Sequence, residues 1–270
     1  KKKTKSLLKI LNLIGIKDTE QLQFDSLTKI IKCYKGNTSK KNSQINAETS
    51  ILYTILKYYK VNNSLPQYEK LPDDTTSYKS LNDNTLSLLF NYLESLALKE
   101  GNNLSWISSI YIMLDTGVRM NEILNIKTKN VDLTSNTIIL EKNDTKNGYK
   151  RILFFNSLSK KYIEKLVARK NEYLIFNEVK KDRMNKSSLS YFFDKIESYL
   201  KLNENRIHAH RLRKTFATRL LKKGCPVTTI QKLLGHTDIK MTMIYLDIDN
   251  TMIENDYFNF YPYEKKEPCD

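Results

Sequence analysis

A polar stretch with two prolines constrains this sequence most, because neither a helix nor a strand can run through it. Pro66 and Pro72 stand among polar side chains over residues 64–77, where both the helical and the strand periodicity of apolar residues stop. We therefore expect this stretch to join two separately folded parts. The predicted divisions are a helical domain at 1–66, a linker at 67–80, a larger domain at 81–250 and a tail at 251–270.

Apolar residues at helical spacing dominate both parts, as amphipathic helices require. Before the linker they form three sets, Leu7–Ile14, Leu27–Tyr34 and Ile51–Tyr59. After the linker, the same pattern predicts helices at about 84–98, 106–114, 158–170, 187–201, 209–223 and 227–234.

Residues 137–155 have a different character. Two runs rich in β-branched, leucine and phenylalanine residues flank a loop that contains Asn147-Gly148, a pair typical of hairpin turns. The predicted fold class is therefore mostly α with a small β-sheet or hairpin, and the larger domain is of the α+β type.

The net charge of +15 indicates a polyanionic partner. Nucleic acid is the first candidate and an anionic membrane surface the second, while a soluble protein with many solvated lysines stays open on charge alone. The sequence has no run of about 18 apolar residues that could span a bilayer, and no amphipathic segment with the aromatic and basic faces of a surface anchor.

The cysteines point to a reducing compartment. Cys33, Cys225 and Cys269 are odd in number and lack the spacing of metal ligands, so we predict a cytoplasmic protein without a disulfide framework or a metal site. The first residue is not Met and no secretory signal is visible, which suggests that the chain begins inside a longer protein.

Histidine is scarce, and its placement is informative. Only three His occur, and His210 begins His-Arg-Leu-Arg, so that His210 and Arg213 share one face of a predicted helix. His236 directly follows the glycine that ends the next predicted helix, and Tyr245 lies nine residues further on. Arg119 stands at the start of a helix, after a glycine turn.

These residue types suit phosphodiester cleavage without a metal. Negative charge grows on the nonbridging oxygens in the transition state, and the planar fork of Arg can contact two of them at once. The leaving oxygen needs a proton donor and the nucleophile needs a base. A tyrosine, with an ordinary pKa of about 10, must be activated by its site.

In order and spacing, these residues resemble the tyrosine recombinase (integrase) family, over about residues 81–250. Within the predicted hairpin, Lys146 falls on the family's catalytic lysine, although Lys150 competes for that role. Lys214 departs from the pattern, since many relatives carry His there. The matching motifs are Thr-Gly-Val-Arg-Met-Asn-Glu at 116–122, Thr-Lys-Asn-Gly-Tyr-Lys-Arg-Ile at 145–152, His-Arg-Leu-Arg at 210–213, Leu-Leu-Gly-His at 233–236 and Tyr245.

The resemblance implies a role for each matched residue. Tyr245 would attack the scissile phosphate and form a 3′-phosphotyrosine with a free 5′-hydroxyl. Arg119 and Arg213 would contact the nonbridging oxygens, and Lys146 would protonate the departing 5′-oxygen. His210 would accept the tyrosine proton or orient the phosphate, and His236 would form a hydrogen bond with the phosphate. Glu122 would support an arginine.

The resemblance also implies an assembly. Two domains would clamp duplex DNA, four protomers would act on two recombination sites, and the tail at 251–270 would dock on a neighbouring protomer. Neither a metal, ATP nor another cofactor would be needed, and accessory directionality or architectural proteins are candidate partners at the nucleoid. The alternatives are a type IB topoisomerase, a telomere resolvase and a DNA-binding regulator without activity.

Overall fold

The structure, a computed structural model, divides the chain into two compact units, Lys1–Ser77 and Tyr78–Asp270. Only residues 71, 79 and 80 of the predicted linker are described, so its bounds stay a prediction. Most of the predicted helix at 7–14 and most of the tail also lie outside the described residues. The described residues are 8, 11, 12, 15, 17, 24–37, 41–59, 71, 79–98, 103–145, 148–201, 206–244, 246–248, 252, 253 and 256.

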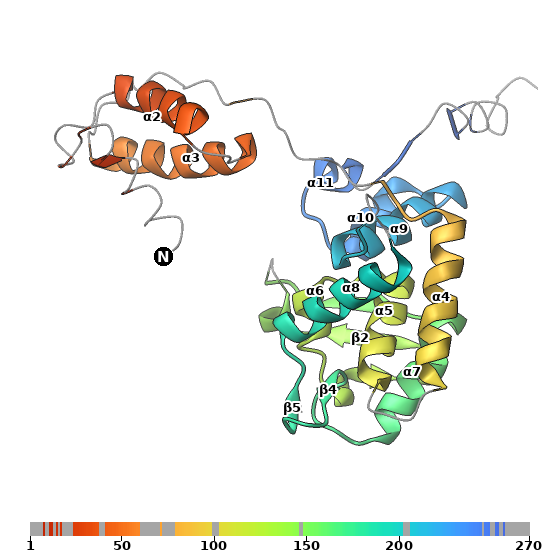
Figure 1. The fold of residues 1–270 in the computed structure, drawn as a ribbon. Coiled ribbons are helices and arrows are strands. Elements are labelled where there is room, and N and C mark those ends of the chain that lie inside the picture. Colours follow the sequence, from red (N-terminus) through yellow and green to blue (C-terminus); the bar gives the residue numbers. More distant parts are fainter. Residues whose placement is uncertain are drawn as a thin grey trace, which may run out of the picture. The chain divides into compact units, whose positions relative to one another are not determined.

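The N-terminal unit contains a pair of helices that pack against each other, α2 (Phe24–Asn37) and α3 (Asn42–Tyr59) (Figure 1). Ile30 on α2 and Ile45 on α3 are buried. Asn46 both donates to the carbonyl of Leu71 (2.8 Å) and accepts from its backbone N–H (2.9 Å), which ties the chain after α3 back to this helix.

The C-terminal unit is mostly helical with small antiparallel sheets, which confirms the predicted fold class. The predicted helices are present, including the one that begins after Arg119, which is the short α6. One further short helix, α11, was not expected. The helices are α4 (Asp83–Ala97), α5 (Leu104–Thr116), α6 (Met120–Ile123), α7 (Ser157–Ala168), α8 (Lys186–Leu200), α9 (Ala209–Lys222), α10 (Val227–Leu234) and α11 (Ile239–Met243).

The predicted hairpin forms β2 and β3, and a third strand extends it. The strands pair antiparallel in the order β1-β2-β3, with Ile138 opposite Leu153 and Leu140 opposite Arg151. A second, two-stranded ribbon, β4 and β5, was not predicted. The strands are β1 (Val131–Asp132), β2 (Thr137–Leu140), β3 (Arg151–Phe154), β4 (Phe176–Asn177) and β5 (Asp182–Arg183).

Side chains alternate along β3 between the interior and the solvent, as the pleat of a strand requires. Leu153 is buried, whereas Ile152 and Phe154 are exposed. Arg151 therefore shares the inner face with Leu153. A charged side chain on the inner face of a sheet needs a partner there, which directs attention to what Arg151 contacts.

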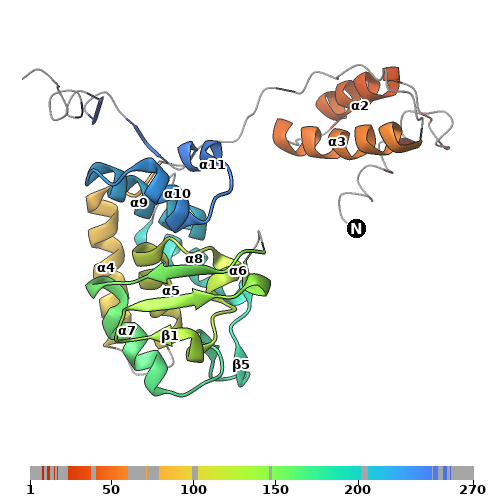
Figure 2. The ribbon, with the colours of Figure 1, turned by 180° about the vertical axis from the view of Figure 1, so that it is seen from behind.

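Helix α5 forms the centre of the C-terminal unit. Ile107, Ile110, Ile112 and Met113 are buried on it, and it contacts α4, α6, α7, α9 and β3. The sheet lies on the face seen in Figure 2, while α8 lies on the opposite face, seen in Figure 1. This central helix fixes the elements whose ends carry the candidate site.

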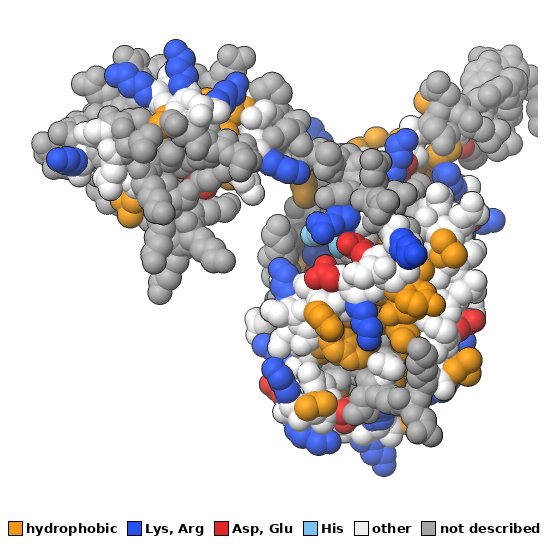
Figure 3. Space-filling view, in the orientation of Figure 1, with side chains coloured by type: hydrophobic (Ala, Val, Ile, Leu, Met, Phe, Trp, Pro, Cys, Tyr) orange, Lys and Arg blue, Asp and Glu red, His pale blue; other side chains and the backbone are white. Residues whose placement is uncertain are grey.

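Lys and Arg side chains are spread over the visible surface of both units (Figure 3). Within the described part of the chain, no helix has the length and apolar character needed to cross a membrane. The described residues also contain no group of three or more His, Cys, Asp and Glu side chains that could hold a metal ion.

Candidate active site

The C-terminal end of α10 gathers three arginines that come from three other segments. The last carbonyls of a helix have no intrahelical partners and carry partial negative charge, so they attract cationic donors. Here, three consecutive carbonyls each accept a hydrogen bond from a different guanidinium. The pairs are Arg151 on β3 to Leu233 (3.0 Å), Arg213 on α9 to Leu234 (2.5 Å) and Arg119 before α6 to Gly235 (3.4 Å).

Two glycines with positive φ make this approach possible. Gly235 ends α10 at φ 64°, and a Cβ on it would lie 2.8 Å from Cδ of Arg151, so a larger residue would push this arginine away. Gly117 ends α5 at φ 63°, and its carbonyl accepts a hydrogen bond from Nη1 of Arg213. Two helix ends therefore position Arg213, which is only 1% exposed.

Glu122 supplies the negative charge among the arginines. Its side chain accepts hydrogen bonds from Nη1 of Arg119 (2.7 Å), the backbone N–H of Arg119 (3.0 Å) and Nη2 of Arg151 (2.5 Å). Burial raises the pKa of this carboxyl, but Arg151 and Arg119 more than offset that effect and hold it below its ordinary value. Glu122 is thus an ionised carboxylate that joins α6 to β3.

The protonation of His236 follows from its neighbours. Nη2 of Arg213 lies 2.9 Å from Nε2 of His236, and because a guanidinium can only donate, Nε2 accepts. The ring proton is then on Nδ1, which lies 2.9 Å from the hydroxyl of Thr242 on α11. Burial, followed by the positive charges of Arg213, Arg119 and Arg151, lowers the pKa of His236 to about 4, so the ring is neutral at pH 7.

A pocket of about 240 Å³ opens beside this network. Four cations and one carboxylate line it, so it carries a strong positive potential that suits an anion. On the face shown in Figure 3, basic side chains and a histidine lie together in a hollow near α10. The lining residues are Arg119, Glu122, Thr145, Tyr149, Lys150, Arg151, Lys232, Gly235, His236 and Thr237.

The sequence-predicted residues fall into three groups. Arg119, Arg213 and His236 meet in this network together with Glu122. His210 lies on α9, one turn before Arg213, with an exposed side chain whose ring lies 6.4 Å from that of His208. The third group, Lys146 and Tyr245, lies outside the described residues.

Lys150, the competitor for the role of Lys146, lies within the pocket lining. Its side chain is largely exposed, and Nζ is 3.8 Å from a carboxylate oxygen of Glu141, a distance that fits a weak surface ion pair. The choice between the two lysines stays open.

Arg151 is the residue that sequence reasoning did not single out. It lies within the hairpin motif, where the resemblance implied no role for it, yet it joins the end of α10 to Glu122. The available signal was its strand position, since it alternates with the outward-facing Ile152. That signal indicates an inward arginine but not its partners.

Comparison with known proteins assigns this arrangement to a family. The model of the phage integrase family matches residues 79–252, well over half of the chain. The chain belongs to the tyrosine recombinase family of phage integrases. The match includes every residue of the arginine network.

Relatives of this family member differ in how much of their length they share with it. A probable integrase/recombinase of Acholeplasma phage L2 is 31% identical over 242 residues, which are 89% of this chain and 82% of the phage protein. Tyrosine recombinase XerA of Saccharolobus solfataricus is 38% identical over 149 residues, 55% of this chain and 47% of XerA. The matched region thus spans only about half of XerA.

Solved structures agree with the family fold along most of the chain. The integrase of transposon Tn1549, solved in complex with transposon right end DNA, has a TM-score of 0.74 at 18% identity and covers 96% of this chain and 92% of its own. XerH site-specific recombinase, solved in a post-cleavage complex with palindromic difH substrate, has a TM-score of 0.74 at 18% identity, with coverages of 97% and 77%. At these identities the likeness establishes the fold alone.

Replacing Glu122 by Gln should destabilise the C-terminal unit by about 3 kcal/mol, because removing one partner of a buried ion pair leaves uncompensated charge. Urea denaturation of both proteins measures this difference. It should shrink as the pH falls below 4.5, the ordinary pKa of Glu, because a lowered folded-state pKa stabilises only while the group is ionised. Glu172→Gln, which breaks an exposed ion pair with Lys127, should change stability little; equal effects would contradict the assigned role.

His236 should titrate far below an ordinary histidine. In a pH series of NMR spectra of the histidine rings, we expect its midpoint near pH 4, because burial and three arginines disfavour the charged ring. In the urea-unfolded chain the same ring should titrate near its ordinary value of 6.5. A folded-state midpoint near 6.5 would mean that the ring is not enclosed by the arginines.

Proposed function

We propose that this chain is a site-specific DNA recombinase that cleaves and rejoins duplex DNA through Tyr245. The observation that carries the proposal is the convergence of Arg119, Arg213 and His236 at the C-terminal end of α10, beside a cationic pocket that Arg119 and His236 line. Tyr245 follows His236 by nine residues, at the spacing that the family motif has. DNA as partner is supported by the DNA complexes of the Tn1549 and XerH proteins, which share the fold.

The cleavage step transfers a phosphoryl group to the tyrosine. The phenolic oxygen of Tyr245 forms a bond to phosphorus, the bond from phosphorus to the 5′-oxygen breaks, and a 3′-phosphotyrosine and a 5′-hydroxyl result. Arg119 and Arg213 bind the nonbridging oxygens as their charge grows. His236, neutral at pH 7, accepts a hydrogen bond from Nη2 of Arg213 and so orients this arginine toward the phosphate without adding charge.

Proton transfer requires two further groups. Lys146 donates a proton to the departing 5′-oxygen, or Lys150 does so from the pocket wall, and His210 accepts the proton of Tyr245 or orients the phosphate. Rejoining runs the same steps backwards with the 5′-hydroxyl of another strand. Because the phosphotyrosine conserves the free energy of the broken bond, the cycle requires neither ATP nor a metal.

The assembly follows from the need to exchange strands between two DNA sites. We propose four protomers on two sites, with the helical N-terminal domain and the catalytic domain clamping the duplex. The positive charge of the chain supplies the affinity for phosphates. Accessory directionality or architectural proteins would act on the same DNA, and the setting would be the nucleoid in the cytoplasm.

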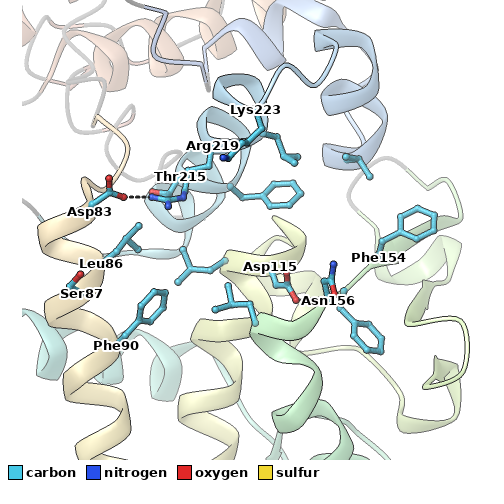
Figure 4. Close-up of a pocket in the computed structure, with 16 residues that line it drawn as sticks. Asp83, Leu86, Ser87, Phe90, Asp115, Phe154, Asn156, Thr215, Arg219 and Lys223 are labelled. Atoms are coloured by element: carbon cyan, nitrogen blue, oxygen red, sulfur yellow. Dashed lines mark hydrogen bonds and ion pairs between the residues drawn. The ribbon is translucent and has the colours of Figure 1, made fainter.

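A second cavity, of about 640 Å³, offers a place for the C-terminal tail of a neighbouring protomer. It lies among α4, α5, β3 and α9, and Figure 4 shows Phe90 and Phe154 on opposite sides of it. Asp83 and Arg219 form an exposed ion pair at its edge (2.5 Å). The tail carries four aromatic residues within 257–261, and such rings fit an apolar cavity of this size.

Covalent trapping tests the proposed chemistry. A duplex site is first selected from a random library by binding to this chain, then nicked so that cleavage releases a short strand and traps the adduct. The wild-type chain should form the adduct, Tyr245→Phe should form none, and Arg213→Ala should slow its formation by about 100- to 1,000-fold. Adduct in Tyr245→Phe would refute the assignment of the nucleophile. Holliday-junction formation from two sites then distinguishes strand exchange from simple relaxation.

Truncation after Asn250 should abolish assembly of protomers on paired sites but leave binding of one protomer to one site intact, since the tail is the proposed contact. Native gel shifts with one and two sites measure both. In the full chain, Phe154→Glu should reproduce the loss by placing a charge in the acceptor cavity. Ile152→Glu is the matched control, because Ile152 is exposed on the same strand but does not line the cavity. Normal assembly of the truncated chain would contradict the proposed docking.

A further inference from the structure

The residues directly after Tyr245 are anchored to α9. Leu246 is buried in an apolar cluster formed by side chains of α9 and α10. The backbone N–H of Asp247 donates to the hydroxyl of Thr218 on α9 (3.4 Å). The chain that follows the proposed nucleophile is therefore held by both an apolar contact and a backbone hydrogen bond.

The Asp247 side chain adds a stronger attachment. One carboxylate oxygen lies 2.7 Å from Nζ of Lys214, and the other accepts the backbone N–H of Ser80 at 2.7 Å. The Lys214 side chain is 8% exposed and that of Asp247 30%. Burial raises the pKa of Asp247, but hydrogen bonds from Lys214 and Ser80 hold it below its ordinary value. We call Lys214, Asp247 and Ser80 the Asp247 clasp.

The third member of the clasp is itself fixed to α9. On one side of Ser80, the carbonyl of Lys79 accepts a hydrogen bond from Nε of Arg211 (2.8 Å). On the other side, the N–H of Leu81 donates to the hydroxyl of Thr215 (2.8 Å). Lys79 and Leu81 thus bind side chains of α9 directly, and Ser80 binds Asp247, which is itself bound to Lys214 on α9. The clasp is therefore fixed to one rigid helix.

Helix α9 also carries Arg213, the residue next to Lys214. One side chain of this pair reaches the carbonyls at the ends of α5 and α10, and the other reaches the segment that follows Tyr245. Two adjacent residues of one helix therefore fix the position of the nucleophile segment relative to the arginines that would bind the phosphate.

We propose that the Asp247 clasp is a positioning device that holds Tyr245 in line with the phosphate bound by the arginines. This inference rests on the proposed function. A misplacement of about 1 Å can cost ~100-fold in rate, so loss of the clasp should slow the attack. Once the phosphotyrosine has formed, the covalent bond itself holds the tyrosine at the phosphate, and rejoining no longer depends on the clasp.

The test compares cleavage with rejoining in single-turnover reactions at saturating duplex. Cleavage is followed on the nicked duplex, and rejoining is started by adding a 5′-hydroxyl strand to the isolated adduct. For Asp247→Asn and Lys214→Met, we expect cleavage to slow by about 10- to 100-fold, with the rejoining rate and the duplex Kd near their wild-type values. The double variant should be no slower than the slower single variant, because both changes remove one interaction.

Two comparisons make the result specific. Arg213→Ala should slow both steps, because it acts on the transition state that they share. Glu172→Gln, which breaks an exposed ion pair elsewhere in the unit, should change neither step. A folding defect would lower the fraction of reactive protein and leave the rate of that fraction unchanged.

The outcomes separate the two proposals. If the wild-type chain forms no adduct, the proposed function fails and the clasp with it. If the wild-type chain forms the adduct and both single variants cleave at its rate, only the clasp is wrong. Equal slowing of cleavage and rejoining, or a loss confined to the reactive fraction, would also overturn the positioning role.

Discussion

The arrangement of the site depends on the C-terminal end of α10. A helix end exposes carbonyls that lack partners and carry partial negative charge. Here three successive carbonyls accept hydrogen bonds from guanidinium groups on β3, on α9 and at the start of α6. Four segments far apart in the sequence are joined in this way. The left-handed Gly235 is part of the arrangement, because a side chain there would occupy the space of Arg151.

Burying three arginines is costly unless their charge is compensated. The carboxylate of Glu122 contacts two of them, and the carbonyls at the end of α10 compensate part of the remaining charge. Such a centre is organised before an anion arrives, so little reorganisation is needed when charge develops on a phosphate. A guanidinium has five N–H donors; Arg119 can therefore keep its contact to α10 and still donate to a phosphate oxygen. The uncompensated positive potential is what the proposed function uses.

Local sequence patterns predicted many of the elements that form the site, but they did not predict its long-range contacts. The helix α9 and the glycine after α10 follow from apolar spacing and local residue preference, which also placed Arg213 and His236. Strands of two residues carry no periodicity, so β1, β4 and β5 were not predicted. Arg151 contacts groups 29 and 82 residues away, beyond the reach of any local pattern. Lys214 stood out as a departure from the family motif, yet nothing in the sequence named Asp247 as its partner.

The described residues before and after Tyr245 are attached to different parts of the arginine site. Before it, Thr242 on α11 is buried and bound to His236, but a helix of five residues has little stability of its own. After it, Asp247 is bound to α9 and to the N–H of Ser80. The first anchor ties the nucleophile segment to a group that contacts Arg213, and the second ties it to the helix that carries Arg213. One anchor thus contacts Arg213 through His236, and the other is attached to the helix that carries Arg213. A shift of α9 would therefore move the phosphate-binding groups and the nucleophile segment together.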